Sequence, residues 1–310
     1  MHSQDEQRTL VAKLRRTISD EVCIALGISD KGVLRKLLGP VFWPPAQAFA
    51  RLVARVDHLV QEKGIPDAAK FLLENFVDEV QVQGAESVPR EGPLLVASNH
   101  PGAYDSIAIL SSLPRQDIKI IVSDIPFLHS LPVISKSLIY ASPGPHGRMA
   151  ALRAMLRHMQ EGGALLIFPT GLVDTDPEMP LAQQSIRAEK ELGNWSSSLE
   201  LILRKAPQTR LLVTIVSGVL APACLHNPLT RLPREQWRKQ KLAEFLQVMQ
   251  QLVLRRKFDL KPRLSFDFPL TAPELLAWGS STDLQQTIIA RARQVLHTHL
   301  NPEIPLEEYV

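Results

Sequence analysis

The fold of this chain is decided by the stretch Pro93-Leu94-Leu95-Val96-Ala97-Ser98-Asn99-His100-Pro101-Gly102-Ala103-Tyr104-Asp105. Its first residues are apolar and predict a short buried strand, which ends at polar and turn-forming residues. His100 and Asp105 are five positions apart, so on one helix they would point about 140° away from each other. The Pro101-Gly102 turn lets a helix that begins near Asp105 fold its carboxylate back onto the imidazole. We therefore predict a histidine base with an acidic partner, the pairing that activates a hydroxyl nucleophile.

Strand-like and helix-like segments alternate in the chain beyond residue 80. The predicted strands are Glu79–Val82, Leu94–Ala97, Ile118–Val122, Leu138–Ala141, Ala164–Phe168, Leu211–Val216 and Arg263–Phe268. Helical patterns lie between them, the clearest over Arg148–Gln160, and capping boxes at Ser197/Glu200 and Thr282/Gln285 predict two further helix starts. This alternation favours an α/β fold with a largely parallel sheet flanked by helices.

Residues 1–80 are predicted to form an N-terminal helical region, and residues 81–310 the domain that carries the sheet. Apolar residues recur on one face of Arg8–Ile24, Pro44-Pro45 are predicted to open a second helix, and Gly64–Asp67 to cap a third. The pair Phe42-Trp43 leaves two alternatives. It either packs the helices onto the core or dips into a membrane interface.

Composition excludes several classes of protein. With 310 residues and a net charge of +3, the chain lacks the basic excess that would indicate a nucleic-acid partner. Cys23 and Cys224 have no metal-ligand spacing, so they are predicted to be buried thiols, with a disulfide as the alternative. No metal site is expected at His100 and Asp105, because a third ligand at supporting spacing is lacking. The longest apolar stretch, Leu211–Leu225, is too short and interrupted to span a bilayer, which needs about 20 residues. The polar N-terminus shows no secretory signal, so a cytoplasmic protein is predicted, with peripheral contact to the inner face of the membrane as an alternative.

Polar and turn residues follow three of the predicted strands. His100 follows Leu94–Ala97, Thr170-Gly171 follow Ala164–Phe168, and the segment from Ser142 to Arg148 follows Leu138–Ala141. In open α/β sheets the ligand crevice lies beyond the carboxyl ends of the strands, so these segments are predicted to share a site. The acidic loop Leu172–Pro180, in contrast, is predicted to be solvated.

Several of these segments carry a family resemblance. Asn99-His100, four further residues and Asp105 resemble the first signature of the lysophosphatidate/glycerol-phosphate acyltransferase superfamily. The block Glu161–Gly171 is similar to the family's Gly-x-hydrophobic-Phe-Pro-Glu-Gly block, with Thr170 where the Glu is usual. Ala141–Arg148 occupies the place of an Arg-bearing segment, and Leu211–Gly218 that of an apolar final block, so the resemblance covers roughly residues 81–220.

The resemblance implies an O-acyltransferase of glycerolipid metabolism. Such an enzyme moves a fatty acyl group from acyl-CoA or acyl-carrier protein to a hydroxyl of a glycerol-phosphate or lysophospholipid-like acceptor. His100 would be the general base and Asp105 its partner. The resemblance implies acceptor-binding roles for Pro169, Thr170 and Gly171, and Arg148 is the nearest candidate for the family's phosphate-binding Arg.

No cofactor is expected, because the carrier thiol of the co-substrate is already a good leaving group. The backbone N–H groups of the Pro101–Ala103 turn are candidates for stabilising the oxyanion. The alternative is a non-catalytic protein on the same fold that binds a lipid or an acyl carrier. The departures from the family pattern at Thr170 and around Ser142 favour it.

Overall fold

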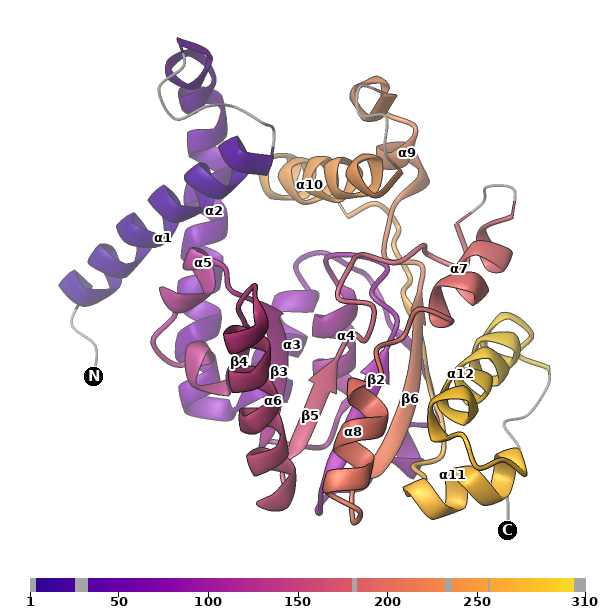
Figure 1. Ribbon diagram of the computed structural model, residues 1–310. Helices are drawn as coiled ribbons and strands as arrows, with labels where there is room; N and C mark the ends of the chain where they lie inside the picture. The colour runs from indigo at the N-terminus through magenta and orange to yellow at the C-terminus, as the bar shows by residue number, and fades with distance from the viewer. Residues whose placement is uncertain (1–3, 26–32, 180–182, 232–235, 256, 304–310) are drawn as a thin grey trace.

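The computed structural model describes residues 4–25, 33–179, 183–231, 236–255 and 257–303 (Figure 1). At its centre lies a seven-stranded sheet in the order β1-β7-β6-β2-β5-β3-β4. The strands are β1 (Gln81–Gln83), β2 (Leu94–Ser98), β3 (Ile118–Ser123), β4 (Leu138–Ala141), β5 (Ala164–Ile167), β6 (Arg210–Ser217) and β7 (Arg263–Phe266). Strands β6, β2, β5, β3 and β4 are parallel, whereas β7 is antiparallel to β6 and parallel to β1. Each predicted strand is present, and the largely parallel sheet is confirmed.

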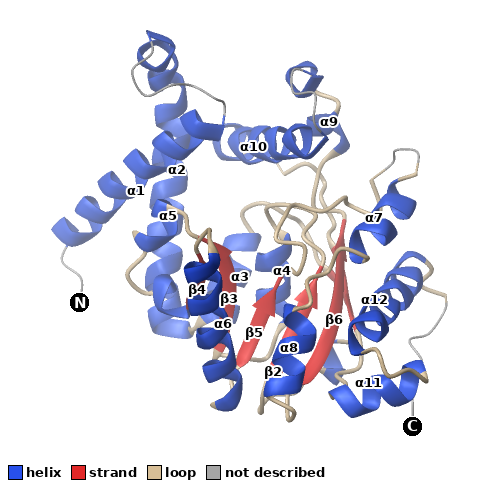
Figure 2. Cartoon of the chain, viewed as in Figure 1, coloured by secondary structure: helices blue, strands red, loops and turns tan. Residues whose placement is uncertain are grey.

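Helices cover both faces of the sheet, as Figure 2 shows with helices in blue around strands in red. They are α1 (Gln4–Ala25), α2 (Val33–Lys63), α3 (Ile65–Leu73), α4 (Asp105–Ser112), α5 (Pro126–His129), α6 (Pro145–Gln160), α7 (Gln184–Leu192), α8 (Ser198–Lys205), α9 (Pro222–Leu225), α10 (Gln236–Leu254), α11 (Ala272–Gly279) and α12 (Leu284–Leu300). Three short 3₁₀ helices, η1 (Ala85–Ser87), η2 (Ile134–Ser137) and η3 (Pro228–Arg231), lie in the connections.

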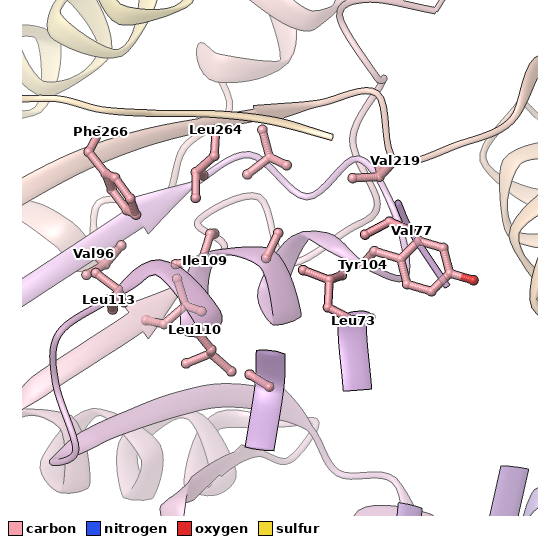
Figure 3. Packing of buried hydrophobic residues seen from close by; sticks show 14 of the residues in the cluster. Leu73, Val77, Val96, Tyr104, Ile109, Leu110, Leu113, Val219, Leu264 and Phe266 are labelled. Atoms are coloured by element: carbon pink, nitrogen blue, oxygen red, sulfur yellow. The ribbon is translucent and has the colours of Figure 1, made fainter. Parts of the chain in front are cut away.

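The core has two halves, one on each face of the sheet, because side chains alternate along every strand. All of β2 is buried: Leu94 and Val96 join the cluster on the side of α3 and α4, and Leu95 and Ala97 join the cluster on the side of α6, α8 and α12. Figure 3 shows part of the first cluster, where Tyr104 lies near Leu73 and Val77. Burial on both faces explains why β2 is a continuous apolar run, and it anchors the strand that precedes His100.

The N-terminal helices depart from the prediction at one point. Helix α2 begins at Val33 and passes through Pro44-Pro45, so the prediction that these prolines open the helix is wrong. Proline lacks the N–H that would bond back along the helix, yet its φ near −65° is close to helical, so the chain can continue through it. Trp43 is 50 % exposed on α2, and the guanidinium of Arg15 on α1 lies 5.0 Å from its ring centroid. The side chain of Phe42 lies outside the described residues, and the division at residues 80 and 81 stays a prediction.

Both predicted capping boxes are wrong. Ser197 occupies the N-cap of α8 without a side-chain cap bond, and α12 is capped by Asp283, whose carboxylate accepts the N–H of Gln286. Aspartate is an equally good N-cap residue, so the helix start shifts by one residue from the predicted Thr282. A capping box does form at Thr271/Glu274 of α11, which the sequence analysis missed.

Cys224 is a buried thiol, as predicted, whereas the side chain of Cys23 lies outside the described residues. Among the described helices, none combines the length and the apolar character that crossing a bilayer requires.

Candidate active site

The site begins where β2 leaves the sheet. Asn99 is 4 % exposed, and its side-chain amide donates to the carbonyl of Val216 on β6 and accepts the N–H of the same residue, both at 2.8 Å. The side chain thus replaces the backbone ladder that would have continued along β2. These two hydrogen bonds to β6 set the point at which His100 emerges from the sheet.

His100 and Asp105 are in contact. Nδ1 of His100 lies 2.7 Å from Oδ2 of Asp105, which is fully buried as the first residue of α4. The same carboxylate oxygen accepts the N–H of Gly102 at 3.0 Å, so the Pro101-Gly102 turn brings the two side chains together. Gly102 therefore does not offer a free N–H to an oxyanion. Of the candidate turn Pro101–Ala103, this leaves the N–H of Ala103, because proline has none.

The imidazole of His100 is partly exposed, with 31 % of its side-chain area accessible. One ring face stacks on Phe168, with centroids 4.4 Å apart and an interplanar angle of 26°. Burial lowers the pKa of His100, but the carboxylates of Asp105, Glu244 and Asp174 outweigh it and raise the pKa to about 9. The ring is thus fixed by one partner at Nδ1 and one aromatic contact, and its surroundings carry negative charge.

Pro169, Thr170 and Gly171 lie beside this pair, because β5 is the neighbour of β2 in the sheet. Neighbouring strands are about 4.8 Å apart, so residues just beyond them share one crevice. The hydroxyl of Thr170 donates to the carbonyl of Leu172 at 3.1 Å and so closes a local turn. Gly171 has φ +66°, a conformation that favours glycine.

Arg148 and Ser142 lie further along the same edge. They follow β4, which is three strands from β2, roughly 14 Å at ordinary strand spacing. Arg148 is exposed on the first turn of α6, and its side chain makes no hydrogen bond or ion pair with the described residues.

A second polar cluster, missed by the sequence analysis, lies at the ends of β3 and β4. Ser142 donates to Asp124 at 2.6 Å, and the same carboxylate lies 2.6 Å from Nε2 of His129. These two hydrogen bonds hold the pKa of Asp124 below its usual range. The available signal was the position of Asp124, which follows a predicted strand as His100 does.

The acidic part of the loop after Gly171 is buried, so the prediction that it is solvated is wrong, although Leu172 is exposed and Pro180 lies outside the described residues. Asp174, Thr175 and Asp176 are 5 %, 8 % and 3 % exposed. Their side chains hold neighbouring elements, because a carboxylate can leave water when backbone N–H groups replace it. Burial raises the pKa of Asp174 and of Asp176 to about 6 in each case.

Helix α10 adds residues that the sequence analysis also missed. Nε2 of Gln240 donates to the carbonyls of Pro101, at 2.8 Å, and Asp174, at 2.7 Å. A Cβ atom placed on Gly102 would lie 3.6 Å from Cδ of Glu244, so this carboxylate also faces the turn. In Figure 1, α10 crosses above the ends of the strands. The spacing of Gln240, Glu244, Gln247 and Gln251 along one helical face was the available signal.

The fold and site define a class: an open α/β protein with a histidine–carboxylate pair beyond the carboxyl end of an interior strand. Residues 79–192 match the family model described as Acyltransferase, which confirms the resemblance seen in the sequence. His100, Asp105, Thr170 and Asp174 lie inside this segment, whereas Gln240 lies outside.

No curated protein matches the chain in sequence. Among solved structures, the 1-acyl-sn-glycerophosphate (LPA) acyltransferase PlsC from Thermotoga maritima is similar. It shares 14 % identity over 96 % of this chain and 98 % of that chain, with a TM-score of 0.43.

Proposed function

We propose that this protein transfers a fatty acyl group from acyl-CoA or acyl-carrier protein to a hydroxyl of a glycerol-phosphate or lysophospholipid-like acceptor. The observation that carries the proposal is the contact of 2.7 Å between Nδ1 of His100 and the buried carboxylate of Asp105, within the segment that matches the Acyltransferase family model. With Nδ1–H donated to Asp105, the lone pair of the neutral ring is on Nε2. Nε2 is then the atom that accepts a proton from the acceptor.

In the reaction, Nε2 of His100 takes the proton of the acceptor hydroxyl while the hydroxyl oxygen attacks the thioester carbonyl carbon. The negative charge of Asp105 stabilises the imidazolium. When the tetrahedral intermediate collapses, the C–S bond breaks and the thiolate leaves with the proton that His100 returns. The products are an ester and a free thiol, and His100 is neutral again. No metal or other cofactor takes part in this proposal, because the thiol leaves readily.

The acceptor is proposed to bind along the carboxyl edge of the sheet. Thr170 has a hydroxyl that donates one hydrogen bond and accepts two, and Pro169 and Gly171 shape the turn around it. Arg148 is the proposed contact for an acceptor phosphate. Its guanidinium can bind phosphate with two parallel hydrogen bonds, and the nearby N-terminus of α6 favours anions.

The experiment is thiol release from purified protein supplied with acyl-CoA and a panel of acceptors. His100→Ala should lower the rate about 10²- to 10⁴-fold, the usual effect of removing a general base. Asp105→Asn should also lower the rate, because an amide does not stabilise the imidazolium charge. His297→Ala is the matched control, since His297 is exposed on α12. Unchanged turnover in folded His100→Ala would contradict the proposal.

The second candidate is a non-catalytic lipid- or acyl-carrier-binding protein. Two observations favour it. Thr170 replaces the family's carboxylate, and Ser142 is engaged with Asp124 where the family has an Arg-bearing segment. Calorimetric binding of acyl-CoA by the wild type, without thiol release for any acceptor, would support this candidate over the enzyme.

A further inference from the structure

The backbone of His100 is held by one residue of the buried acidic loop. The N–H of His100 donates to Oδ2 of Asp174 at 2.8 Å, and the N–H of Asp174 donates to the carbonyl of His100 at 2.7 Å. Both backbone groups of His100 thus pair with Asp174. His100 lies beyond the end of β2, where the sheet ladder no longer supplies partners.

Asp174 is itself held from several directions. Gln240 of α10 donates to its carbonyl, and the next residue, Thr175, is anchored on α7 by Glu191 through its N–H and its hydroxyl at 2.6 and 2.9 Å. Asp176 then accepts the N–H groups of Gly218 and Val219, each at 3.1 Å, at the end of β6. The loop is therefore anchored on α10, on α7 and at the end of β6, in addition to its bonds to His100.

The support matters because catalysis by a base depends on its position. The ring of His100 is oriented by Asp105 at Nδ1 and by Phe168 on one face. Both contacts are made by the ring, so neither of them binds the backbone of His100. A displacement of about 1 Å in a reacting group can lower a rate about 10²-fold.

We propose that Asp174 is a positioning residue for acyl transfer, which holds both backbone groups of His100 so that Nε2 reaches the acceptor hydroxyl. This inference rests on the proposed function, because it needs His100 to be the base.

The charge of Asp174 allows a second measurement, the pKa of His100. His100 is faced by Asp105 of α4, Glu244 of α10 and Asp174, and each of these carboxylates favours the imidazolium. Asp174 is in turn faced by Glu191 and by Thr170 as well as by His100. Removal of the charge on Asp174 should therefore lower the pKa of His100, even where the hydrogen bond to the backbone is kept.

The test compares Asp174→Asn and Asp174→Ala. The asparagine oxygen still accepts the N–H of His100, whereas alanine leaves that N–H without its side-chain partner. At about pH 10, roughly one unit above the pKa of His100, the ring is neutral and kcat reports position alone. Asp174→Ala should lower this kcat about 10²-fold with KM for acyl-CoA unchanged. Asp174→Asn should stay within about threefold of wild type, while its histidine titration, followed by NMR, moves to lower pH.

Asp57→Ala is the matched control. It also removes a buried carboxylate that accepts backbone N–H groups, but these belong to Val133 and Ile134 and not to His100. Its kcat should remain close to that of the wild type. The inference is overturned if Asp174→Ala keeps the wild-type kcat, if Asp57→Ala loses as much, or if the His100 titration does not move in Asp174→Asn. An active His100→Ala would contradict the proposed function instead, so the two failures are distinguishable.

Discussion

At the scale of single residues, the proposed base His100 is faced by three carboxylates, those of Asp105, Glu244 and Asp174. Because the pKa of His100 is raised to about 9, only about 1 % of the ring is neutral at pH 7. A general base works in its neutral form. We therefore expect kcat/KM to rise about tenfold per pH unit from pH 7 and to level off above about 9. The measurement is a pH profile corrected for spontaneous thioester hydrolysis, and a flat profile between these values would contradict it.

Thr170 provides the second prediction at this scale. It lies beside the His100 segment and carries no charge where the family has a carboxylate. We expect Thr170→Glu to shift preference toward glycerol phosphate or lysophosphatidate, without restoring activity to a His100→Ala background. The measurement is the ratio of kcat/KM for two acceptors in wild type and variant. A wild type that already prefers lysophosphatidate, with an unchanged ratio in the variant, would show that Thr170 does not select the acceptor.

At the scale of secondary-structure elements, α10 and the pair α1–α2 differ in how they attach. Helix α10 is bound through buried amides: Gln247 accepts the N–H of Ala221 at 2.6 Å and donates to the carbonyl of Val219 at 2.9 Å. The α1–α2 pair has its own apolar cluster around Leu14, Ala50 and Val53, with Leu131 from the loop beyond α5. Helix α10 packs against α2, but the two differ in role: α10 supplies polar contacts of the site, whereas α2 exposes Trp43.

Trp43 provides the prediction at the element scale. If this half-exposed indole contacts a membrane interface, Trp43→Ser should lower binding to anionic liposomes by about 1 kcal/mol or more while the melting temperature stays within a few degrees. Leu201→Ser is the control, because Leu201 is another exposed apolar residue, on α8. Retained liposome affinity together with a clear loss of thermal stability would instead assign Trp43 to packing against Arg15.

At the scale of the whole molecule, His299 links the C-terminal helix to the sheet. It is fully buried on α12, with Nε2 at 2.7 Å from the hydroxyl of Ser217 on β6 and Nδ1 at 2.8 Å from that of Ser265 on β7. Burial, assisted by the positive charge of Arg263, lowers the pKa of His299 to about 3. The folded state therefore keeps this ring neutral, whereas the unfolded chain protonates it below about pH 6.5.

The prediction at this scale follows from that difference. The stability that neutral His299 contributes is fully present above about pH 6.5 and is lost as the pH falls toward 3. At pH 7, His299→Gln should be less stable than wild type by about 1–3 kcal/mol, since the hydroxyl of Ser265 loses its partner and that of Ser217 keeps only its bond to Glu178. At about pH 5 the difference in free energy of unfolding between wild type and variant should be smaller by on the order of 2 kcal/mol. Urea unfolding at both pH values measures this difference, and His297→Gln, at an exposed histidine, is the control. An equal difference at the two pH values would contradict the prediction.

Much of the fold could be predicted because local patterns carry it. The run Leu94–Ala97 is apolar at every position, and such a run between turn signals indicates an interior strand of a parallel sheet. The helix starts were less predictable: Ser197 and Thr282 have the right neighbours for capping boxes, yet Asp283 caps α12. Several residue types cap equally well, so tertiary packing decides among adjacent candidates. The N-terminal boundary at Pro44 failed for a similar reason, because proline's φ is compatible with the helix that continues through it.

The sequence by itself determined the His100–Asp105 contact, since both residues lie on one short turn whose geometry local sterics dictate. It also determined the sheet edge at which Thr170 and Arg148 would lie, because parallel strands end at a common edge. Only the tertiary structure decided that Asp174 holds the backbone of His100, that Gln240 and Glu244 join the site from α10, and that Arg148 lies three strands away from β2. These contacts join residues far apart in the chain. Their geometry depends on strand order and on helix packing, which no local pattern of residues specifies.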